Sequence, residues 1–227
     1  RIKAIDASPA KAHPGVVAVF TGKDMTGVNS LPCGWDLRKA KNVPGVLQDL
    51  AIVPHMPLTS DVARHVGDPV AVVIAESQAA AVDAAEKVRV DWEPLPAVTA
   101  TDKAAQAGQP QLHAGAPGNV AFKWALGDGD ATDTAFKTAA VTVKKHIVNQ
   151  RLVANAMEPR ACVARFDAAT GDLTLWVTSQ NPHVHRLLMC AFVLGIPEHK
   201  VRVIAPDVGG GFGSKIFLYN EEVVCSW

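Results

Sequence analysis

The sequence predicts an α+β protein built in two parts, and three observations support that fold class. Over residues 1–105, short runs of β-branched residues alternate with a clearly helical stretch, as in a compact α/β unit. Over residues 121–227, a β-hairpin is followed by a helix and a further strand. Residues 106–120 lie between the two parts and combine glycine and proline with a polar, alanine-rich background, which is the composition of a linker.

Strands are expected in the first part where valine and isoleucine cluster or alternate, over residues 2–6, 16–20, 70–75 and 88–92. The continuous apolar run at 70–75 is typical of a buried strand, and the alternation at 88–92 is typical of a half-buried one. The alanine-rich stretch at 77–87 predicts a helix with Ser77 as its N-cap.

The second part is expected to open with a helix over 131–140 and a strand over 141–150. Its hairpin should turn at 167–171, where Asp, Thr and Gly favour a turn, between strands at 162–166 and 173–177. Apolar residues at helical spacing then predict a helix over 181–194, ended by Gly195-Ile196-Pro197. A strand at 200–204 and a helix at 221–227 complete the expected elements.

Charge and hydropathy exclude two classes of partner. Lys plus Arg and Asp plus Glu both number 22, so the formal charge is zero and gives no electrostatic reason to expect nucleic acid. The longest apolar runs, such as 69–75, are the length of a strand and far too short for a membrane span.

The four cysteines, Cys33, Cys162, Cys190 and Cys225, are scattered and form no C-x-x-C pair. This pattern favours reduced thiols, several of them buried, in a cytoplasmic protein, and disfavours an iron–sulfur cluster on this chain. Because the sequence starts at Arg1 without methionine and stops at Trp227 inside an expected helix, we expect a truncated first part and an incomplete second part.

The most informative segment is the glycine loop, residues 206–215, which follows the expected strand at 200–204. Four glycines within 209–213 remove the Cβ atoms that would keep a ligand away from the backbone, and they permit positive φ. The loop is not a phosphate-binding P-loop, because Ser214 precedes Lys215 and Ile216 follows it. It also fails the dinucleotide pattern G-x-G-x-x-G, which would need glycine at 214.

Five ordered segments resemble the molybdenum hydroxylase family, which includes xanthine dehydrogenase, aldehyde oxidoreductase and carbon monoxide dehydrogenase large subunits. They are Arg64 to Ala71 (RHVGDPVA), Asp91 to Pro96 (DWEPLP), Asn149-Gln150-Arg151 followed by Met157-Glu158-Pro159-Arg160, Thr178 to Pro182 (TSQNP) and Gly209 to Lys215 (GGGFGSK). Among these family members, the sequence is most similar in general character to carbon monoxide dehydrogenase-like large subunits. The resemblance implies an α/β hammerhead domain over 1–105 and the start of a molybdopterin-binding domain over 121–227.

The resemblance also implies the residues that bind the cofactor. Gln180 would donate through its NH₂ group to the molybdenum oxo ligand, without adding charge. The backbone N–H groups of Gly210, Gly211, Phe212 and Gly213 would approach the molybdenum–dithiolene group, and Phe212 would exclude water. The sequence alone leaves a plainer interpretation open, in which Ser179 or Asn181 caps a helix, Gln180 faces solvent and Phe212 packs in the core. The cofactor interpretation requires Gln180 and the glycine loop to share one surface.

The substrate pocket departs from the purine-oxidising members of the family. Those enzymes place a glutamate directly after the Gly-x-Lys end of the loop, where this chain has Ile216. An aliphatic side chain cannot anchor a purine by hydrogen bonding, so carbon monoxide, aldehydes and N-heterocycles remain open. The resemblance implies that the family's catalytic glutamate, and the copper-binding cysteine of true carbon monoxide dehydrogenases, lie in sequence beyond Trp227. We therefore expect no catalytic residue and no metal ligand in this chain, and no activity from it alone.

The implied cofactors are molybdenum–molybdopterin, in its cytosine dinucleotide form, together with FAD and [2Fe-2S] centres on partner subunits, while the use of copper is open. The implied partners are an FAD-binding medium subunit and an iron–sulfur small subunit, in a dimer of heterotrimers. The rival hypothesis is a noncatalytic binding or assembly module with the same fold.

Five further titratable residues are expected to be structural. His183 and His185 would diverge by about 200° on a helix, so they cannot share a metal and are expected on a surface or an interface. Glu158 is expected in an ion pair with the nearby Arg160. Glu221 and Glu222 are adjacent and should not share a helical face, which argues against a carboxylate dyad.

Overall fold

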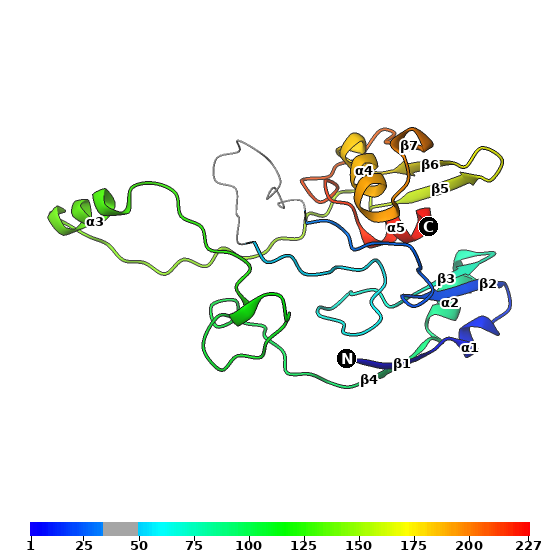
Figure 1. The fold of residues 1–227 in the computed structure, drawn as a ribbon, viewed down its shortest axis with the longest axis horizontal. Helices are drawn as coiled ribbons and strands as arrows, with labels where there is room; N and C mark the ends of the chain where they lie inside the picture. The colour runs from blue at the N-terminus through cyan, green and yellow to red at the C-terminus, as the bar shows by residue number, and fades with distance from the viewer. Residues whose placement is uncertain (34–49) are drawn as a thin grey trace.

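The computed structural model describes residues 1–33 and 50–227. Figure 1 shows the β1–β4 and β2–β3 strand pairs on one side, the sheet of β5, β6 and β7 on the other, and a long arm that carries α3 away from both.

The first part contains two antiparallel strand pairs. β1 (Ile2–Asp6) pairs with β4 (Arg89–Trp92), and β2 (Val16–Thr21) pairs with β3 (Ala71–Ala75). All four strands predicted here are confirmed to within one residue at each end. The short α1 (Ser8–Lys11) lies between β1 and β2 in the chain.

The helix expected at 77–87 is confirmed as α2 (Gln78–Ala85), and the Ser77 hydroxyl caps it by accepting the Ala80 N–H at 3.2 Å. Ala84 of this helix packs with Ala10 and Val19 in a small core. The expected full burial of β3 is wrong, because Ile74 is 45% exposed and no residue of β3 is buried. β3 is paired with one strand, and α2 packs against it without covering its whole surface.

The segment predicted as a linker folds back on itself around Asn119, which follows Pro117 and Gly118 in the short 3-10 helix η1 (Pro117–Asn119). The Asn119 amide donates to the carbonyls of Ala104 and Pro110, both at 2.9 Å, and its Oδ1 accepts the Leu112 N–H at 2.9 Å. These bonds close a local loop from 104 to 119.

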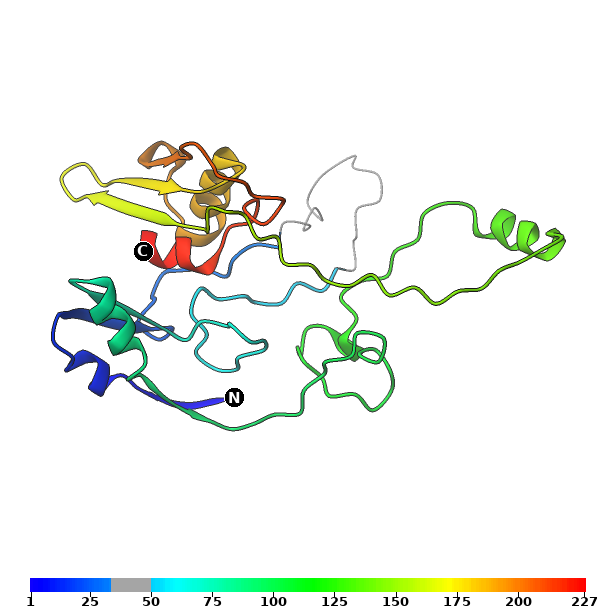
Figure 2. The same ribbon diagram turned by 180° about the vertical axis from the view of Figure 1, so that it is seen from behind.

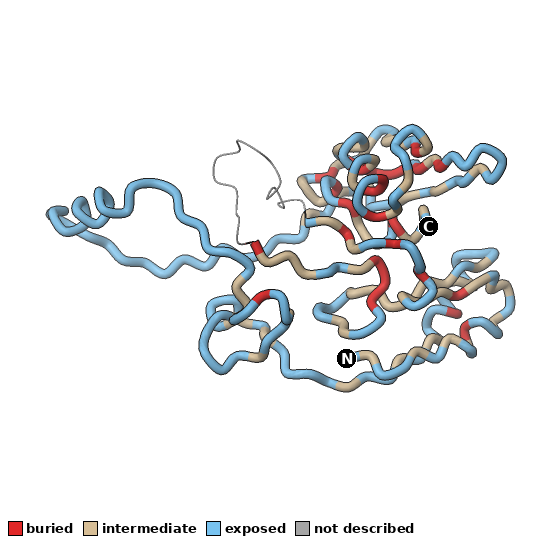
Figure 3. Tube along the Cα trace, in the orientation of Figure 1, coloured by how far each residue is buried: buried red, intermediate tan, exposed pale blue. Residues whose placement is uncertain are grey.

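The arm begins after residue 120 and carries α3 (Gly129–Thr138), which confirms the predicted helix with shifted bounds. The strand predicted at 141–150 is wrong. Within the described residues this segment has no ladder partner, and Val143 and Ile147 are 83% and 79% exposed. A strand needs a neighbour for its backbone hydrogen bonds, so a β-branched pattern alone did not produce one. Figure 3 shows the arm as exposed along its length.

The second part is built on a three-stranded sheet. β5 (Cys162–Asp167) and β6 (Asp172–Val177) form the predicted hairpin, and β7 (Val201–Ile204) pairs with β6 in parallel, Leu175 opposite Val203. The connection from β6 to β7 runs through α4 (Pro182–Leu188), a π-helical continuation, η2 (Met189–Leu194), and the 3-10 helix η3 (Glu198–Lys200). Gly195 ends the helix at φ 66, as predicted.

One core holds this sheet to its helices and to the first part. Leu173, Leu175 and Val177 project from β6 into a cluster with Met189, Cys190 and Val193 of η2 and Val223 of α5 (Asn220–Ser226). Met25, Val28, Leu31 and Leu58 of the first part belong to the same cluster. In Figures 1 and 2, α5 lies between the β5–β6–β7 sheet and the β2–β3 pair, where Trp227 meets Phe20 edge to face with ring centroids 5.2 Å apart.

Candidate functional site

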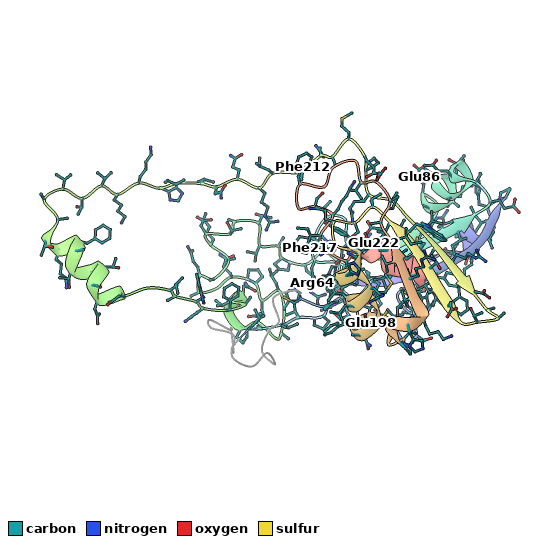
Figure 4. The ribbon with its side chains drawn as sticks, turned by 90° about the horizontal axis from the view of Figure 1, so that it is seen from above. Arg64, Glu86, Glu198, Phe212, Phe217 and Glu222 are labelled. Atoms are coloured by element: carbon teal, nitrogen blue, oxygen red, sulfur yellow. The ribbon has the colours of Figure 1, made fainter. Side chains whose placement is uncertain are left out.

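The parallel pairing of β6 and β7 places the two most informative motifs at one edge of the sheet. Thr178 to Asn181 directly follow β6, and the glycine loop follows β7. Because parallel strands end at the same edge, the segments after them emerge side by side. Figure 4 labels Phe212 and Phe217 near this edge and Glu222 on α5 beneath it.

Gln180 joins the two segments directly. Its side-chain Oε1 accepts the backbone N–H groups of Gly213 at 3.0 Å and Lys215 at 3.2 Å. The backbone N–H of Gln180 donates to the Lys215 carbonyl at 2.9 Å. The expectation that Gln180 and the loop share one surface is therefore confirmed. With Oε1 occupied, the NH₂ group of this exposed side chain makes no hydrogen bond to any described residue and is available as a donor.

The loop leaves two backbone donors without an internal partner. The Gly210 N–H donates to the Val208 carbonyl at 2.9 Å, and the Gly213 N–H is used by Gln180. The N–H groups of Gly211 and Phe212 bond to nothing in the described chain. Of the four backbone donors expected to face a ligand, these two are the ones that remain open.

Backbone geometry explains why glycine is needed here. Gly210 and Gly213 have φ values of 94 and 86, and a Cβ on Gly211 would lie 2.3 Å from Gln180 Oε1. Phe212 itself adopts φ 50, and its ring is 78% exposed, so the plainer interpretation in which Phe212 packs in the core is wrong.

An ion pair closes the base of the loop. Glu158 Oε2 accepts the Gly209 N–H at 2.8 Å and the Lys215 ammonium at 2.8 Å, and that ammonium also donates to the Glu158 carbonyl at 2.9 Å. Lys215 is 2% exposed, so its charge is buried against this one carboxylate. The Lys215 ammonium, and after it the Gly209 N–H, hold the pKa of the Glu158 carboxyl below its usual value.

The expected pairing of Glu158 with Arg160 is wrong. Pro159 separates them in an extended segment, and Arg160 instead stacks over the Tyr219 ring, 3.5 Å from its centroid, and pairs with Glu221 at 3.4 Å. Spacing along the sequence could not reveal Lys215 as the partner of Glu158, because 57 positions separate the two residues.

Behind Gln180 lies a buried polar network that the sequence did not predict. His185 Nδ1 is 2.9 Å from both Ser179 Oγ and Asn181 Oδ1, and His185 Nε2 is 3.2 Å from Glu222 Oε2. Glu222 Oε2 also accepts the Tyr219 N–H at 3.0 Å, and the Tyr219 hydroxyl donates to the Ser214 carbonyl. Hydrogen bonds therefore run from the segment before Gln180, through α4 and α5, to the end of the glycine loop.

The surface or interface position expected for His185 is wrong, since this residue is 1% exposed, whereas His183 is exposed as predicted. One signal could have found it: Leu188, Met189 and Val193 continue the same helical face at i+3, i+4 and i+8. Glu221 and Glu222 do diverge as expected, with side chains 65% and 7% exposed.

Ile216 directly follows the loop and is 41% exposed, next to Phe217 at 58%. The chain thus presents two apolar side chains beside the segment that holds Gln180. Across residues 1–33 and 50–227, His, Cys, Asp and Glu form no cluster of three or more that could hold a metal ion.

A separate polar cavity of about 390 Å³ lies in the first part, among residues 53–68 and His113. Asp68 accepts from the Thr59 hydroxyl at 2.7 Å and from the Arg64 N–H at 3.0 Å. Burial, and then the nearby Arg64, lower the pKa of His113. No residue of the glycine loop lines this cavity.

Comparison with known domain families decides the assignment. The molybdopterin cofactor-binding domain matches residues 112–227, more than half of the 227 residues. The a/b hammerhead domain of aldehyde oxidase and xanthine dehydrogenase matches residues 1–96. The chain belongs to the molybdenum hydroxylase family. The α+β fold class and the two domain types implied by the resemblance are confirmed.

Known molybdenum hydroxylases match this chain along almost its whole length. The carbon monoxide dehydrogenase large chain of Afipia carboxidovorans is 38% identical over 235 residues, covering 98% of this chain and 27% of that protein. The nicotine 6-hydroxylase large subunit of Paenarthrobacter nicotinovorans is 35% identical over 225 residues, covering 99% and 26%. The crystal structure of quinoline 2-oxidoreductase from Pseudomonas putida 86 matches with a TM-score of 0.85 at 34% identity, covering 99% of this chain and 27% of that one.

The chain thus spans about a quarter of the length of these molybdenum hydroxylase relatives. In the described part of the chain, none of the helices combines the length and apolar character needed to cross a bilayer.

Proposed function

We propose that residues 178–182 and the glycine loop form part of the binding site for molybdenum–molybdopterin in an oxidoreductase subunit. The observation that carries this proposal is the pair of hydrogen bonds from the Gly213 and Lys215 N–H groups to Gln180 Oε1, at 3.0 and 3.2 Å. They join the two motifs and turn the carboxamide so that only its NH₂ end is left to meet a ligand.

The donor set suits an anionic cofactor with acceptor atoms. Gln180 offers a neutral NH₂ group, and Gly211 and Phe212 offer two unpartnered backbone N–H groups. Such donors, fixed before the ligand arrives, stabilise negative charge without reorganising. A Cβ on Gly211 would push Gln180 away, so the absence of a side chain at residue 211 is what brings these donors together.

When bound, the cofactor supplies the oxidation chemistry, with water as the oxygen source. The residues of this chain would orient it: the Gln180 NH₂ group and the Gly211 and Phe212 N–H groups would donate hydrogen bonds to it, and the exposed Phe212 ring would limit the access of water. We propose no residue of this chain as the base.

We propose a small substrate that needs no carboxylate anchor, namely carbon monoxide, an aldehyde or an N-heterocycle. Ile216 and Phe217 are exposed apolar side chains that directly follow the glycine loop, and Ile216 stands where the purine-oxidising members have glutamate. The similarity to carbon monoxide, nicotine and quinoline enzymes supports the same range.

We further propose the cytosine dinucleotide form of the cofactor, and FAD and [2Fe-2S] centres on medium and small partner subunits in a dimer of heterotrimers. The relatives named as large chains or large subunits support partner subunits. A cytoplasmic location is proposed from the four free cysteines.

The test uses the full polypeptide that contains this sequence, produced with its partner subunits. Molybdenum per polypeptide and turnover with an artificial electron acceptor are measured for wild type, Gln180→Glu and Gln180→Ala. Gln180→Glu keeps an oxygen that can accept from Gly213 and Lys215 but replaces the NH₂ donor, so it should lower kcat by about 10²–10³-fold. Gln78→Ala, on the exposed surface of α2, is the matched control and should leave both readouts unchanged.

The outcomes separate the hypotheses. Bound molybdenum and turnover in wild type, with loss in Gln180→Glu, support the proposal. A folded wild type with no molybdenum and no turnover supports the rival noncatalytic module. Full activity in Gln180→Glu would overturn the role of Gln180.

A further inference from the structure

Two cysteines that are 63 positions apart lie where α5 packs against β5. Cys162 is the first residue of β5, and Cys225 lies in the last turn of α5, which packs against β5. Arg160, two residues before Cys162, pairs with Glu221, four residues before Cys225, at 3.4 Å, so the two thiols lie side by side where α5 meets β5. There the Cys162 thiol acts as a hydrogen-bond donor to Cys225. Cys162 is half-buried and Cys225 is exposed, while neither takes part in the proposed cofactor site.

The direction of this hydrogen bond distinguishes the two thiols. The hydrogen bond donated by Cys162 lowers the pKa of Cys225 to about 7, and this effect exceeds the opposite effects of burial and of the nearby Glu221 and Glu222. The same contact, followed by burial, raises the pKa of Cys162. At neutral pH Cys225 is therefore the sulfur with thiolate character and with access to solvent, and Cys162 is its protonated neighbour.

We propose that Cys162 and Cys225 form a redox-active dithiol, in which a peroxide oxidises Cys225 and Cys162 then closes an intramolecular disulfide. In the first step the Cys225 thiolate attacks one peroxide oxygen, the O–O bond breaks, and Cys225 becomes a sulfenic acid. With hydrogen peroxide, the other oxygen leaves as hydroxide and takes up a proton to form water.

In the second step Cys162 attacks the sulfenic sulfur, an S–S bond forms and the S–O bond breaks, releasing a second water. In total, two thiols and one hydrogen peroxide give one disulfide and two waters, and the two sulfurs lose two electrons to the peroxide. A dithiol reductant reverses the reaction by thiol–disulfide exchange.

The disulfide would fix the last turn of α5 to the start of β5. α5 also carries Glu222, which bonds His185 at 3.2 Å and the Tyr219 N–H at 3.0 Å. Oxidation would therefore act on the helix that supports the segment before Gln180 and the end of the glycine loop, without touching either.

The reaction rate should reflect two opposing effects. A thiol with a pKa near 7 is about half ionised at pH 7, against roughly 3% for an ordinary thiol, but its thiolate is also a weaker nucleophile. Together these give Cys225 an advantage of about threefold in alkylation rate over an ordinary exposed thiol. Cys33, which is exposed and has none of the other three cysteines as a neighbour, is the internal reference.

The test is peptide mapping of the full polypeptide after one equivalent of hydrogen peroxide and blocking of free thiols. A dithiothreitol-sensitive link between the Cys162 and Cys225 peptides is expected. Cys162→Ser should instead stop at a sulfenic acid on Cys225, trapped by dimedone, and Cys225→Ser should give neither product. Cys33→Ser should behave as wild type.

Thermal unfolding of each variant checks that the serine substitutions leave the protein folded. Absence of the Cys162–Cys225 link in folded wild type would overturn the proposal, as would equal dimedone labelling of Cys33 and Cys225 in Cys162→Ser. Because the readout is covalent mapping, it succeeds or fails independently of molybdenum content and turnover.

Discussion

Gln180 Oε1 accepts the Gly213 N–H at 3.0 Å, and a Cβ on Gly211 would lie only 2.3 Å from the same oxygen. The carboxamide therefore lies in space that exists because residue 211 has no side chain. This relationship couples a single glycine in the sequence to the position of the only side-chain donor in the proposed cofactor site.

Gly211→Ala should displace Gln180 or open the glycine loop. The added methyl group meets the Gln180 oxygen and carbons at 2.3–2.9 Å, and this clash should cost about 1–3 kcal/mol of folding free energy. We expect a lower denaturation midpoint together with reduced molybdenum content in the full polypeptide. Gly129→Ala is the control, because nothing lies within 4 Å of a Cβ there and the residue begins α3. Equal stability of the two variants would contradict the geometry.

Glu158→Gln should destabilise the protein at neutral pH by leaving the buried Lys215 ammonium without its carboxylate. The folded-state pKa of Glu158 lies below its ordinary value of 4.5, so its contribution to stability is present above about that pH. It is lost as the pH falls through the folded-state pKa. The difference in unfolding midpoint between wild type and Glu158→Gln should therefore shrink as the pH falls below about 4.5, and denaturation followed at several pH values measures it.

The matched control for this change is Glu86→Gln. Glu86 is exposed at the end of α2 and forms no ion pair with a described residue. Its substitution should alter the unfolding midpoint little, and by a similar amount at each pH. If the difference in unfolding midpoint between wild type and Glu158→Gln does not change with pH, the Lys215 contact does not stabilise the protein through charge.

His185→Leu should cost about 1–3 kcal/mol of unfolding free energy, because it fills the space of the imidazole but removes the hydrogen bonds that His185 makes to Glu222 and Ser179. Glu222 is 6% exposed, so water cannot readily replace the lost bond. Chemical denaturation measures the loss. His183→Leu, two residues away on the exposed face, should stay within about 0.5 kcal/mol of wild type. A similar loss at both positions would refute the network.

Local patterns predicted most of the fold because each signal depends on neighbours in sequence. The Ser77 cap, the hairpin around 167–171 and the Gly195 terminus all depend on residues within a few positions of one another. The strand expected at 141–150 was wrong for the opposite reason. Its β-branched pattern is present, but a strand also requires a partner, which sequence periodicity does not specify.

The candidate site shows the same contrast between local signals, which the sequence reveals, and long-range contacts, which it does not. Gln180 and the glycine loop were identified through the resemblance of their motifs to those of the family, and their position after two expected strands indicated that they could meet at one edge of a sheet. The partners of Glu158 and His185 were missed, since Lys215 and Glu222 are 57 and 37 positions away and only the folded chain brings them together. Periodicity could have indicated that His185 is buried, but not which residue it contacts.

Substrate preference gives the most direct test of Ile216. In the complete enzyme, we expect xanthine to be a poor substrate beside carbon monoxide, an aldehyde or an N-heteroaromatic compound, each assayed with the same artificial electron acceptor. A purine would meet an aliphatic side chain where a carboxylate could have accepted its hydrogen bonds, and the loss of such a charged hydrogen bond lowers kcat/KM by about 10- to 100-fold.

Two variants test the role of residue 216 directly. Ile216→Glu should reduce the difference in kcat/KM between xanthine and the other substrates by raising activity on xanthine, whereas Ile216→Val, which keeps the site apolar, should preserve the order of substrates. Since Ile216 is 41% exposed, neither change should unfold the protein, and its thermal midpoint checks this. Xanthine as the best substrate of the wild-type enzyme by kcat/KM would show that residue 216 does not select against purines.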